Sequence, residues 1–379
     1  MKITGIEPFA VQASNRSFVF CVVDTDEGIS GIGECGVGTR SEAIVGAFEH
    51  IREQIVGEDP SRIEHLWQLM YRGAFFPAGG IVGSAMSAVD IALWDIRGKV
   101  LGVPTYQLLG GLVRDKVVCY PHNACDNGLD AFLESARKTT DEGWKFVRFH
   151  LPSRGDLLEP RQAIRDGVAW VEAIRKELGP DLEICLDVHT RLEPSESIEL
   201  ARALEPYRIF FLEDPIRSED TNALRRVRQV ARVPIAAGEQ YAGKWAFRQL
   251  IEEDLIDYCR VDLCIAGGLT ESKKIAGWCE THYIRMVTHN PLGPVSSAAC
   301  LALNLSTPNF GVQEQPSRPG ANWNDLFPVQ IQWQDGYLLP PTRPGLGIEF
   351  DREALRKLPR SKPLASRRLR RLDNSYTNW

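Results

Sequence analysis

Three acidic residues follow apolar, strand-like runs at equal spacing along the middle of the chain. Asp187 follows EICL, Glu213 follows IFFL and Glu239 follows PIAAG, so successive acids lie 26 residues apart. That interval accommodates one strand, one helix and their connections. Parallel strands joined by helices end at the same edge of their sheet, and in a closed barrel they end at one mouth. The spacing therefore predicts that the three carboxylates meet at the mouth of an α/β barrel.

The same interval continues beyond the three acids. Asp262 comes 23 residues after Glu239, His289 comes 27 residues later, and Glu314 lies another 25 residues on. From residue 117 onward, short apolar runs alternate with helical stretches, which is typical of βαβ units. Seven or eight such units in about 200 residues favour closure of the sheet, so we expect a (β/α)7β-type TIM barrel.

The segment before the barrel has a different pattern. Residues 18–24 and 29–34 flank the turn TDEG and predict a β-hairpin. Apolar residues recur at helical spacing over 40–57, 60–72 and 81–100. We therefore predict an α+β capping domain over 1–118, a catalytic barrel over 119–325, and a C-terminal segment over 326–379 that returns to the capping domain.

The three equally spaced acids also indicate a metal site. A single acid after a strand usually caps the next helix, but this explanation is poor for three acids that each close a strongly apolar run. Carboxylates that are forced together repel one another unless a cation lies between them. Oxygen ligands with open coordination positions suit a hard cation that keeps waters or substrate oxygens. The pattern predicts a Mg²⁺ site formed by Asp187, Glu213 and Glu239.

Two histidines lie beside these acids in the predicted barrel. His289 is one strand beyond Asp262, whose carboxylate can accept the Nδ1 proton and make the other ring nitrogen more basic. His189 is two residues beyond Asp187, and strand alternation directs its side chain into the same cavity. An imidazole at the position of His189 can donate a proton to a departing hydroxyl.

Composition and charge exclude several classes of function. The net charge of −6 argues against a nucleic-acid surface, and no run approaches the roughly 18 apolar residues of a membrane span. Arginines at 367, 368, 370 and 371 are better explained by a solvated or subunit-contact tail. The nine cysteines include no CxxC pair, so we expect buried, reduced thiols in a cytoplasmic protein.

The motifs LDVH, FLEDP and AAGE, followed by VD…AGG and THN, resemble the enolase superfamily and, within it, the mandelate racemase subgroup. The resemblance covers nearly the whole chain and implies the same three Mg²⁺ ligands and the same His289–Asp262 base. DVH, HNPLGP and VQEQ are similar to the galactonate dehydratases, which implies that Glu314 hydrogen-bonds a carboxylate oxygen of the intermediate. LDVHTRLEP and PNFGVQE also resemble the mannonate dehydratases. We expect a homo-oligomer, from dimer to octamer.

The second predicted barrel strand departs from the racemase pattern. Racemase-type relatives carry KxK there, whereas GWKFVRFH places Arg148 and His150 at these positions. Arg148 suits a clamp for a carboxylate or hydroxyl, and His150 is either a base or a substrate contact. The mannonate dehydratases carry a tyrosine base in a longer segment before the first metal ligand, and no tyrosine lies between Arg148 and Asp187. His122 resembles a residue of that family.

Capping loops and aromatic residues complete the predicted pocket. The turn 14–17 and the stretch 35–40 are expected to close over the mouth, with Arg16 and Arg40 near the substrate. Trp323, together with the pair at positions 75 and 76, is predicted to line the pocket wall.

These residues predict an aldonate dehydratase. His289 would take the proton alpha to the carboxylate, His189 would protonate the leaving C3 hydroxyl, and a 2-keto-3-deoxy sugar acid would form. A galactonate-type substrate is favoured. The alternatives are a mannonate or gluconate dehydratase, a racemase or epimerase that pairs His150 with His289, and a barrel that only binds a sugar acid.

Overall fold

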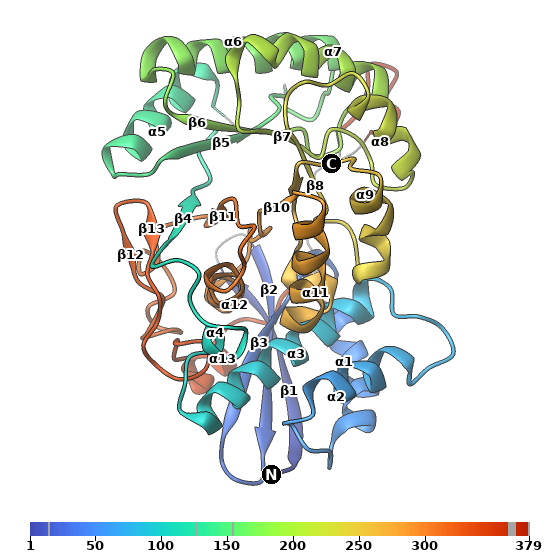
Figure 1. The fold of residues 1–379 in the computed structure, drawn as a ribbon, viewed down its shortest axis with the longest axis vertical. Helices are drawn as coiled ribbons and strands as arrows, with labels where there is room; N and C mark the ends of the chain where they lie inside the picture. Colours follow the sequence, from blue (N-terminus) through green and yellow to red (C-terminus); the bar gives the residue numbers. More distant parts are fainter. Residues whose placement is uncertain (14–15, 126, 154, 363–368, 378–379) are drawn as a thin grey trace.

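A three-stranded antiparallel sheet and three helices form the amino-terminal part of the molecule (Figure 1). The computed structural model describes residues 1–13, 16–125, 127–153, 155–362 and 369–377. The elements of this part are β1 (Ile3–Ala13), β2 (Arg16–Thr25), β3 (Ser30–Cys35), the short helix η1 (Gly38–Arg40), α1 (Ser41–Ile55), α2 (Ile63–Arg72) and α3 (Gly80–Leu101). β2 and β3 form the predicted hairpin, and β1 pairs with the other edge of β2.

The apolar run in β2 is continuous because both faces of the sheet are buried. Val19, Cys21 and Val23 pack with α1–α3, whereas Phe18 and Phe20 pack toward the barrel. Successive side chains on a strand point to opposite faces, so an unbroken run of apolar residues is the signature of a sheet that is covered on both sides.

The backbone of β3 lies directly against α3. A Cβ atom on Gly33 would stand 1.8 Å from the carbonyl oxygen of Ala88, and one on Gly31 would stand 2.1 Å from that of Ala92. Only glycine permits this approach, because any side chain would occupy the space of the helix backbone. This close contact fixes the position of β3 against α3, and β3 ends next to the barrel.

In the part of the chain that the structure describes, eight strands form the barrel. They are β4 (Val117–Tyr120), β5 (Phe146–His150), β6 (Glu183–Asp187), β7 (Phe211–Glu213), β8 (Ile235–Ala237), β9 (Tyr258–Cys259), β10 (Arg285–Met286) and β11 (Gln313–Glu314). β5 to β10 form one parallel sheet in sequence order, and β11 pairs in parallel with β4. A parallel bridge from Met286 to Phe310 joins β10 to the start of β11, and the Asn123 N–H donates to the Arg148 carbonyl between β4 and β5.

The interior of the barrel is a packed layer of side chains. Tyr120, Phe146, Cys185, Phe211 and Ala236, from five successive strands, form one buried cluster with two valines that flank β10 and β11. One inward residue from each of several strands is what a filled barrel requires. The predicted (β/α)7β barrel is confirmed.

Helices surround the barrel and cover its outer face (Figure 1). They are α4 (Thr105–Leu108), α5 (Leu129–Asp141), α6 (Pro160–Leu178), α7 (Pro194–Leu204), η2 (Glu205–Tyr207), α8 (Thr221–Arg228), η3 (Lys244–Phe247), α9 (Arg248–Glu252), α10 (Leu263–Ala266), α11 (Gly268–Thr281) and α12 (Pro294–Leu305). α5, α6 and α7 pack their buried faces on β5–β7.

The C-terminal segment contacts both halves of the molecule. β12 (Trp333–Gln334) and β13 (Tyr337–Leu338) form a hairpin that extends β4. α13 (Arg352–Lys357) lies near β1, where the Ser361 N–H donates to the Ala10 carbonyl. The Arg370 N–H instead donates to the Asp156 carbonyl in the barrel. Residues 367 and 368 of the arginine cluster lie outside the described residues, and the predicted domain limits stay predictions.

Three buried acids join the capping part to the rest of the chain, and we call their contact zone the seam. Glu34 on β3 accepts hydrogen bonds from the Gly293 and Ser296 N–H groups at the start of α12. The Oδ2 of Asp90 on α3 accepts from the Thr270 N–H, and its Oδ1 accepts from the Thr270 hydroxyl. Asp95 accepts from the N–H groups of Ile32 and Leu346. Each acid therefore links segments that are distant in the sequence.

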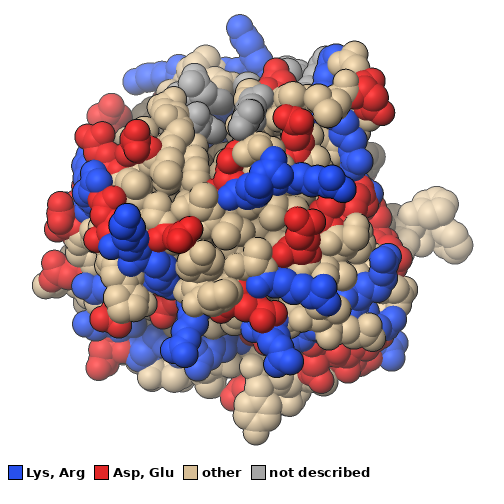
Figure 2. Space-filling view, turned by 90° about the horizontal axis from the view of Figure 1, so that it is seen from above, with Lys and Arg blue, Asp and Glu red and all other residues tan. Residues whose placement is uncertain are grey.

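Among the described residues, no helix has the length and apolar character needed to span a membrane. The face seen in Figure 2 carries basic and acidic side chains intermixed, without a large field of one sign. This face presents no basic stripe of the kind that nucleic-acid-binding proteins carry. All nine cysteines are buried, and no disulfide joins two described residues.

Candidate active site

A histidine and an aspartate at the ends of adjacent strands form a hydrogen-bonded pair. His289 follows β10 and Asp262 follows β9, and the two residues are joined by a parallel bridge. The His289 Nδ1 lies 2.8 Å from the Asp262 Oδ2. The other oxygen of Asp262 accepts the Cys264 N–H at the start of α10, which fixes the carboxylate. The structure thus brings together the two residues that the sequence predicts as base and orienting acid.

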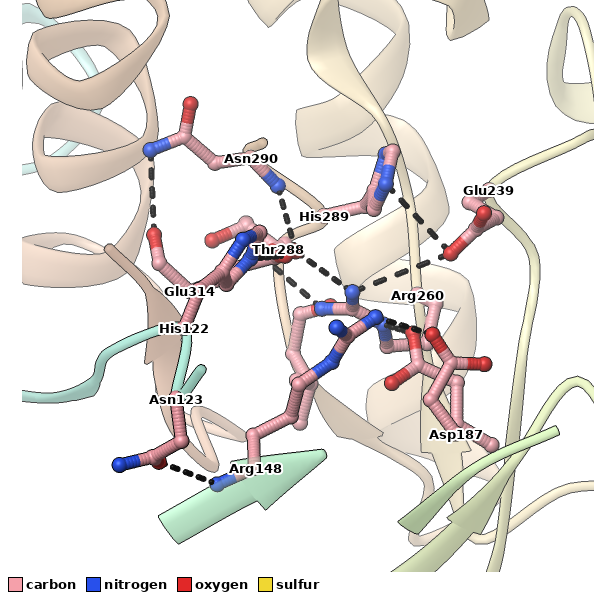
Figure 3. Close-up of polar contacts among 12 residues, drawn as sticks. His122, Asn123, Arg148, Asp187, Glu239, Arg260, Thr288, His289, Asn290 and Glu314 are labelled. Atoms are coloured by element: carbon pink, nitrogen blue, oxygen red, sulfur yellow. Dashed lines mark hydrogen bonds and ion pairs between the residues drawn. The ribbon is translucent and has the colours of Figure 1, made fainter. Parts of the chain in front are cut away.

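The surroundings of His289 are strongly anionic. Its Nε2 lies 3.5 Å from a carboxylate oxygen of Glu239 (Figure 3). Burial lowers the pKa of His289, but the carboxylates of Glu239, Glu314 and Asp262 outweigh burial and raise that pKa to about 9. Groups with such perturbed protonation are concentrated at functional sites.

The three acids at equal spacing lie on adjacent strands. Asp187 ends β6, Glu213 ends β7, and Glu239 stands two residues beyond β8. Asp187 forms an ion pair with Arg148, Glu213 forms one with Arg260, and Glu239 lies 3.9 Å from the Arg260 guanidinium. Among the described residues, no three His, Cys, Asp or Glu side chains are arranged so that they could already hold a metal ion.

The chemistry of these acids nevertheless fits a bound cation. Burial raises the pKa of Glu239, and the charges of Asp214, Glu213 and Asp187 raise it further against the opposing effect of His289. The Oε2 of Glu213 is buried and has no hydrogen-bond partner among the described residues. Buried carboxylates that repel one another, one with an oxygen left unsatisfied, are an oxygen donor set that a hard divalent cation would stabilise.

His189 lies at the Asp187 end of this acidic cluster. Its Nε2 is 2.7 Å from the Asp187 Oδ2 and 3.2 Å from the Arg148 guanidinium. His150, at the end of β5, stacks on the His189 ring at a centroid distance of 5.8 Å, and its Nδ1 is 3.2 Å from the Cys125 thiol. Burial, followed by the charges of Arg191, His189 and Arg148, lowers the pKa of His150 to about 2. The structure places Arg148, His150 and His189 side by side.

The backbone is strained where β6 and β7 end. His189, Thr190 and Asp214 have φ values of 52°, 56° and 39°, a region that residues other than glycine seldom adopt. Such conformations cost about 1–3 kcal/mol each and persist where the surrounding structure enforces them, often at active sites. These strained residues directly follow the two strands that carry Asp187 and Glu213.

Glu314 and His122 form a second imidazole–carboxylate pair. His122 follows β4, and its Nε2 is 2.5 Å from the Oε1 of Glu314 on β11 (Figure 3). The Oε2 of Glu314 accepts from Arg260 at 2.6 Å and from the Asn290 N–H at 2.9 Å. Burial raises the pKa of Glu314, but Arg260, His289 and His122 outweigh it and hold that pKa well below its ordinary value.

Arg260 is a further candidate site residue that the sequence motifs alone do not single out. It is fully buried, and it contacts Glu213, Glu314 and the carbonyl oxygens of Val287 and Thr288. A usable signal was present, because Arg260 precedes Asp262 by two residues and strand alternation directs both side chains to the same face. Asp214 and Asn290, next to predicted residues, were missed as well.

The predicted pocket wall is only partly present. Trp323 packs edge-to-face on Phe18 of β2 at 4.7 Å and lines a small cavity with residues that follow β10 and β11. Phe75 and Phe76 are 92% and 78% exposed on the loop between α2 and α3, so their prediction as wall residues is wrong for this chain. Their apolar character suggested burial, but the loop projects from the body (Figure 1). Residues 14 and 15 of the predicted capping turn lie outside the described residues.

Comparison with known proteins matches this arrangement to a family. The model of the enolase C-terminal domain-like family matches residues 131–354, and that of the mandelate racemase / muconate lactonizing enzyme N-terminal domain matches residues 6–110. The chain belongs to the mandelate racemase subgroup of the enolase superfamily. The resemblance in its motifs is thereby confirmed.

Relatives within the superfamily align along nearly their whole length. A D-mannonate dehydratase from Caulobacter vibrioides is 35% identical, covering 97% of this chain and 98% of the relative. A D-galactonate dehydratase from Ralstonia nicotianae is also 35% identical and aligns over 100% of both chains. The crystal structure of an enolase from Pantoea ananatis with bound D-gluconate and Mg superposes with a TM-score of 0.93 at 30% identity, covering 100% of this chain and 99% of that one.

Proposed function

We propose that this superfamily member is a Mg²⁺-dependent aldonate dehydratase that converts a sugar acid into a 2-keto-3-deoxy acid. The chain is a sugar acid dehydratase, a hydro-lyase, as its relatives are. The observation that carries the proposal is the placement of two imidazoles at opposite ends of one carboxylate cluster. His289 contacts the cluster through Glu239, and His189 contacts it through Asp187.

His289 has the geometry of the general base. Asp262 accepts a hydrogen bond from its Nδ1, so Nε2 is the ring nitrogen that remains for the substrate, and once Nε2 has lost its own proton it can take the proton from C2. The electron pair of the C2–H bond then moves into the carboxylate and gives an enediolate. Asp262 stabilises the imidazolium that results.

His189 has the position of the general acid. Its imidazole is partly exposed at the mouth, next to Asp187 and Arg148. When the enediolate collapses, the C3–O bond breaks and a proton from His189 converts the leaving hydroxide into water. In the enol that remains, the C2 hydroxyl loses its proton and C3 gains one, which gives the 2-keto-3-deoxy acid.

Asp187, Glu213 and Glu239 are the side chains that would hold Mg²⁺. A bound divalent cation would supply positive charge where the substrate carboxylate becomes more negative. The neighbouring Arg148 would orient the substrate carboxylate or a hydroxyl, and His150 and Trp323 would contact the rest of the sugar acid. A homo-oligomer in the cytoplasm is part of the same proposal.

A galactonate-type substrate is favoured because no tyrosine lies between Arg148 and Asp187. The mannonate and galactonate dehydratases are equally similar to the chain. Mannonate and gluconate should therefore also be assayed as substrates. Epimerase activity should be assayed as well, because His150 stacks on His189 and lies on the second strand, where racemases carry a base.

The experiment is a screen of aldonates and aldarates with Mg²⁺, followed by variants tested in D₂O. Turnover should give a keto acid. His289→Asn should lower both solvent exchange of the C2 proton and turnover by about 10²–10⁴-fold. His189→Asn should retain C2 exchange but lose dehydration, because only the second step needs its proton.

His282→Asn is the matched control. His282 also pairs with a carboxylate, Asp254, at 3.0 Å, but it lies on the surface at the end of α11. It should leave turnover unchanged. Normal dehydration by His189→Asn would disprove the assignment of the acid, and C2 exchange without water loss in the wild type would favour the epimerase.

A further inference from the structure

One edge of the His189 ring contacts the acidic cluster. Its Nε2 is 2.7 Å from the Asp187 Oδ2 and 3.2 Å from the Arg148 guanidinium. The backbone of His189 has a φ of 52°, a conformation that persists only where neighbouring groups enforce it. A proton donor also needs a fixed orientation, because a misplacement of about 1 Å can slow a step about 10²-fold. The groups that pack on the His189 ring therefore affect the proton transfer.

His150 packs on the face of the His189 ring. The two rings are stacked, with their centroids 5.8 Å apart and their planes inclined by 16°. His150 ends β5 and pairs in register with Asp187 at the end of β6, so the stack bridges two adjacent strands. Aromatic rings in contact adopt preferred mutual orientations. The position of the His150 ring therefore limits how far the His189 ring can tilt.

His150 in turn contacts the thiol of Cys125. The Sγ atom lies 3.2 Å from Nδ1 and 3.6 Å from Nε2 of His150. A thiol is both a weak donor and a weak acceptor, so it can form a hydrogen bond with either tautomer of the imidazole. Whichever group donates, the contact limits the rotation of the His150 ring about its bond to Cβ.

The loop that carries Cys125 is held on β5 and on α5. The Asn123 side-chain oxygen accepts a hydrogen bond from the Arg148 N–H (Figure 3), and the Asn123 N–H donates to the Arg148 carbonyl. The Nδ2 of Asn123 donates to the Thr139 hydroxyl on α5 at 2.8 Å. Cys125 follows two residues later, so its thiol is attached to a fixed segment of backbone.

The surroundings of Cys125 differ from those of the other cysteines. Cys125 is 9% exposed, whereas each of the other eight is at most 1% exposed. A thiol that is fully buried among apolar groups acts as a small hydrophobic side chain. Cys125 instead lies next to an imidazole at the end of a barrel strand, where a polar contact has a consequence for the site.

Given the proposed function, we infer that Cys125 is a positioning residue for the proton transfer from His189 and that it acts through His150. The thiol holds the His150 ring, the His150 ring holds the His189 ring, and His189 then directs its proton at the C3 hydroxyl as the C3–O bond breaks. Removal of the C2 proton does not depend on these contacts, because His289 adjoins the other end of the acidic cluster.

The test measures how the enediolate divides between return of a proton to C2 and loss of the C3 hydroxyl. The probe is the aldonate that the wild type dehydrates best, incubated with Mg²⁺ in D₂O while C2 exchange and keto-acid formation are followed together. Cys125→Ala should lower the ratio of dehydration to exchange roughly three- to tenfold, the effect of one lost hydrogen bond. Cys125→Ser should keep most of the ratio, because a hydroxyl can replace the thiol. Cys125→Val should lose it, although valine fills the space.

Variants of His150 change the same contact from the other side. His150→Phe keeps a ring that can stack but has no nitrogen atom for the thiol, and His150→Ala removes the stack. His150→Phe should lower the ratio as Cys125→Ala does, and His150→Ala should lower it further. Cys125→Ala should add nothing in the His150→Ala background, because the thiol then has no ring to hold. The His150 variants also decide the question if a Cys125 variant does not fold.

Cys119→Ala is the matched control. Cys119 is a fully buried cysteine on β4, and its thiol donates to the Gly336 carbonyl at 3.4 Å. Its substitution should lower the free energy of unfolding but leave the ratio of dehydration to exchange unchanged. A loss of stability alone therefore does not imitate the expected result.

Two results would overturn the role of Cys125 while His189→Asn still blocks dehydration. One is an equal loss of exchange and dehydration in Cys125→Ala, and the other is a wild-type ratio in both Cys125→Ala and His150→Phe. Normal dehydration by His189→Asn, or no dehydration of any sugar acid by the wild type, would instead overturn the proposed function on which this role rests.

Discussion

Buried acids occur in two regions of this molecule, and their surroundings differ. In the seam, both oxygens of Glu34 and of Asp90 accept hydrogen bonds from N–H or O–H groups of the opposite segment. At the mouth, Glu213 has an unsatisfied buried oxygen, and the carboxylate of Glu239 has no ion-pair partner among the described residues closer than 3.5 Å. The acids of the seam are satisfied by matched donors, whereas Glu213 and Glu239 at the mouth are not.

The difference separates a structural role from a functional one. A buried carboxylate with matched donors ties segments together, because the cost of dehydrating it is offset by fixed hydrogen bonds. A cluster of mutually repelling carboxylates lowers the stability of the fold and is kept where a ligand of opposite charge binds. The seam should therefore control stability and the mouth should control activity, and one substitution of the same kind in each region tests this.

The largest effect is expected at the mouth. Glu239→Gln should lower turnover of the sugar acid by about 10³-fold, roughly 4 kcal/mol of activation free energy, because an amide cannot supply the negative charge that a Mg²⁺ ligand needs. The free energy of unfolding without added metal should stay equal or rise, since the amide relieves the repulsion from Glu213 and Asp214. Steady-state kinetics, Mg²⁺ titration calorimetry and urea unfolding measure the three quantities.

Glu253→Gln is a suitable control, because Glu253 lies on the surface in an ion pair with Arg225. It should change neither turnover nor Mg²⁺ affinity. A Glu239→Gln variant that binds Mg²⁺ as tightly as the wild type would remove Glu239 from the ligand set and would weaken the contrast between the mouth and the seam.

The next effect is expected at the seam. Glu34→Gln should lower the free energy of unfolding by about 1–3 kcal/mol, because only one of its two terminal atoms can still accept and the other meets an N–H group of α12. Turnover per folded molecule should change far less than in Glu239→Gln. Urea unfolding monitored by circular dichroism gives the stability, and a variant as stable as the wild type would show that the seam acid is not structural.

Much of this contrast could be predicted from the sequence, and some of it could not. The placement of Asp187, Glu213 and Glu239 follows from strand alternation and a constant interval, both of which are local properties. The helices predicted at 40–57 and 81–100 occur at Ser41–Ile55 and Gly80–Leu101 for the same reason. These features need only the period of the apolar residues.

The partners of the charged residues depend on contacts between distant segments. No local sequence pattern shows that Arg260 pairs with Glu314 and Glu213, or that Glu34 caps a helix that begins 260 residues later. The position of Asp90 in an apolar helix indicates that its carboxylate has hydrogen-bond donors, because a buried acid needs them, but it does not show which residues supply them. Phe75 and Phe76 show that apolar character alone does not determine burial, because both side chains are exposed.

The smallest effect is a change in the pH dependence of stability at the seam. Burial raises the pKa of Asp90 from 3.8 to about 7, with Glu271 adding to the shift and the Thr270 hydrogen bonds and Lys274 opposing it. Between pH 3.8 and 7 the folded state therefore binds more protons than the unfolded state. Asp90 makes the protein most stable below this window, and its contribution is lost as the pH rises through 7.

Asp90→Asn should remove this part of the pH dependence while it keeps the contacts. The hydroxyl of Thr270 can accept a hydrogen bond from the new amide NH₂ group, and the amide oxygen can accept the hydrogen bond from the Thr270 N–H. In Glu34→Gln, by contrast, the amide NH₂ group meets a backbone N–H, which cannot accept a hydrogen bond. Relative to wild type, the free energy of unfolding of the variant should gain up to about 1.4 kcal/mol for each pH unit between pH 4 and pH 7. Urea unfolding at a series of pH values measures the difference, and parallel curves for the two proteins would show that Asp90 is ionised throughout and that the seam tolerates a buried charge as the mouth does.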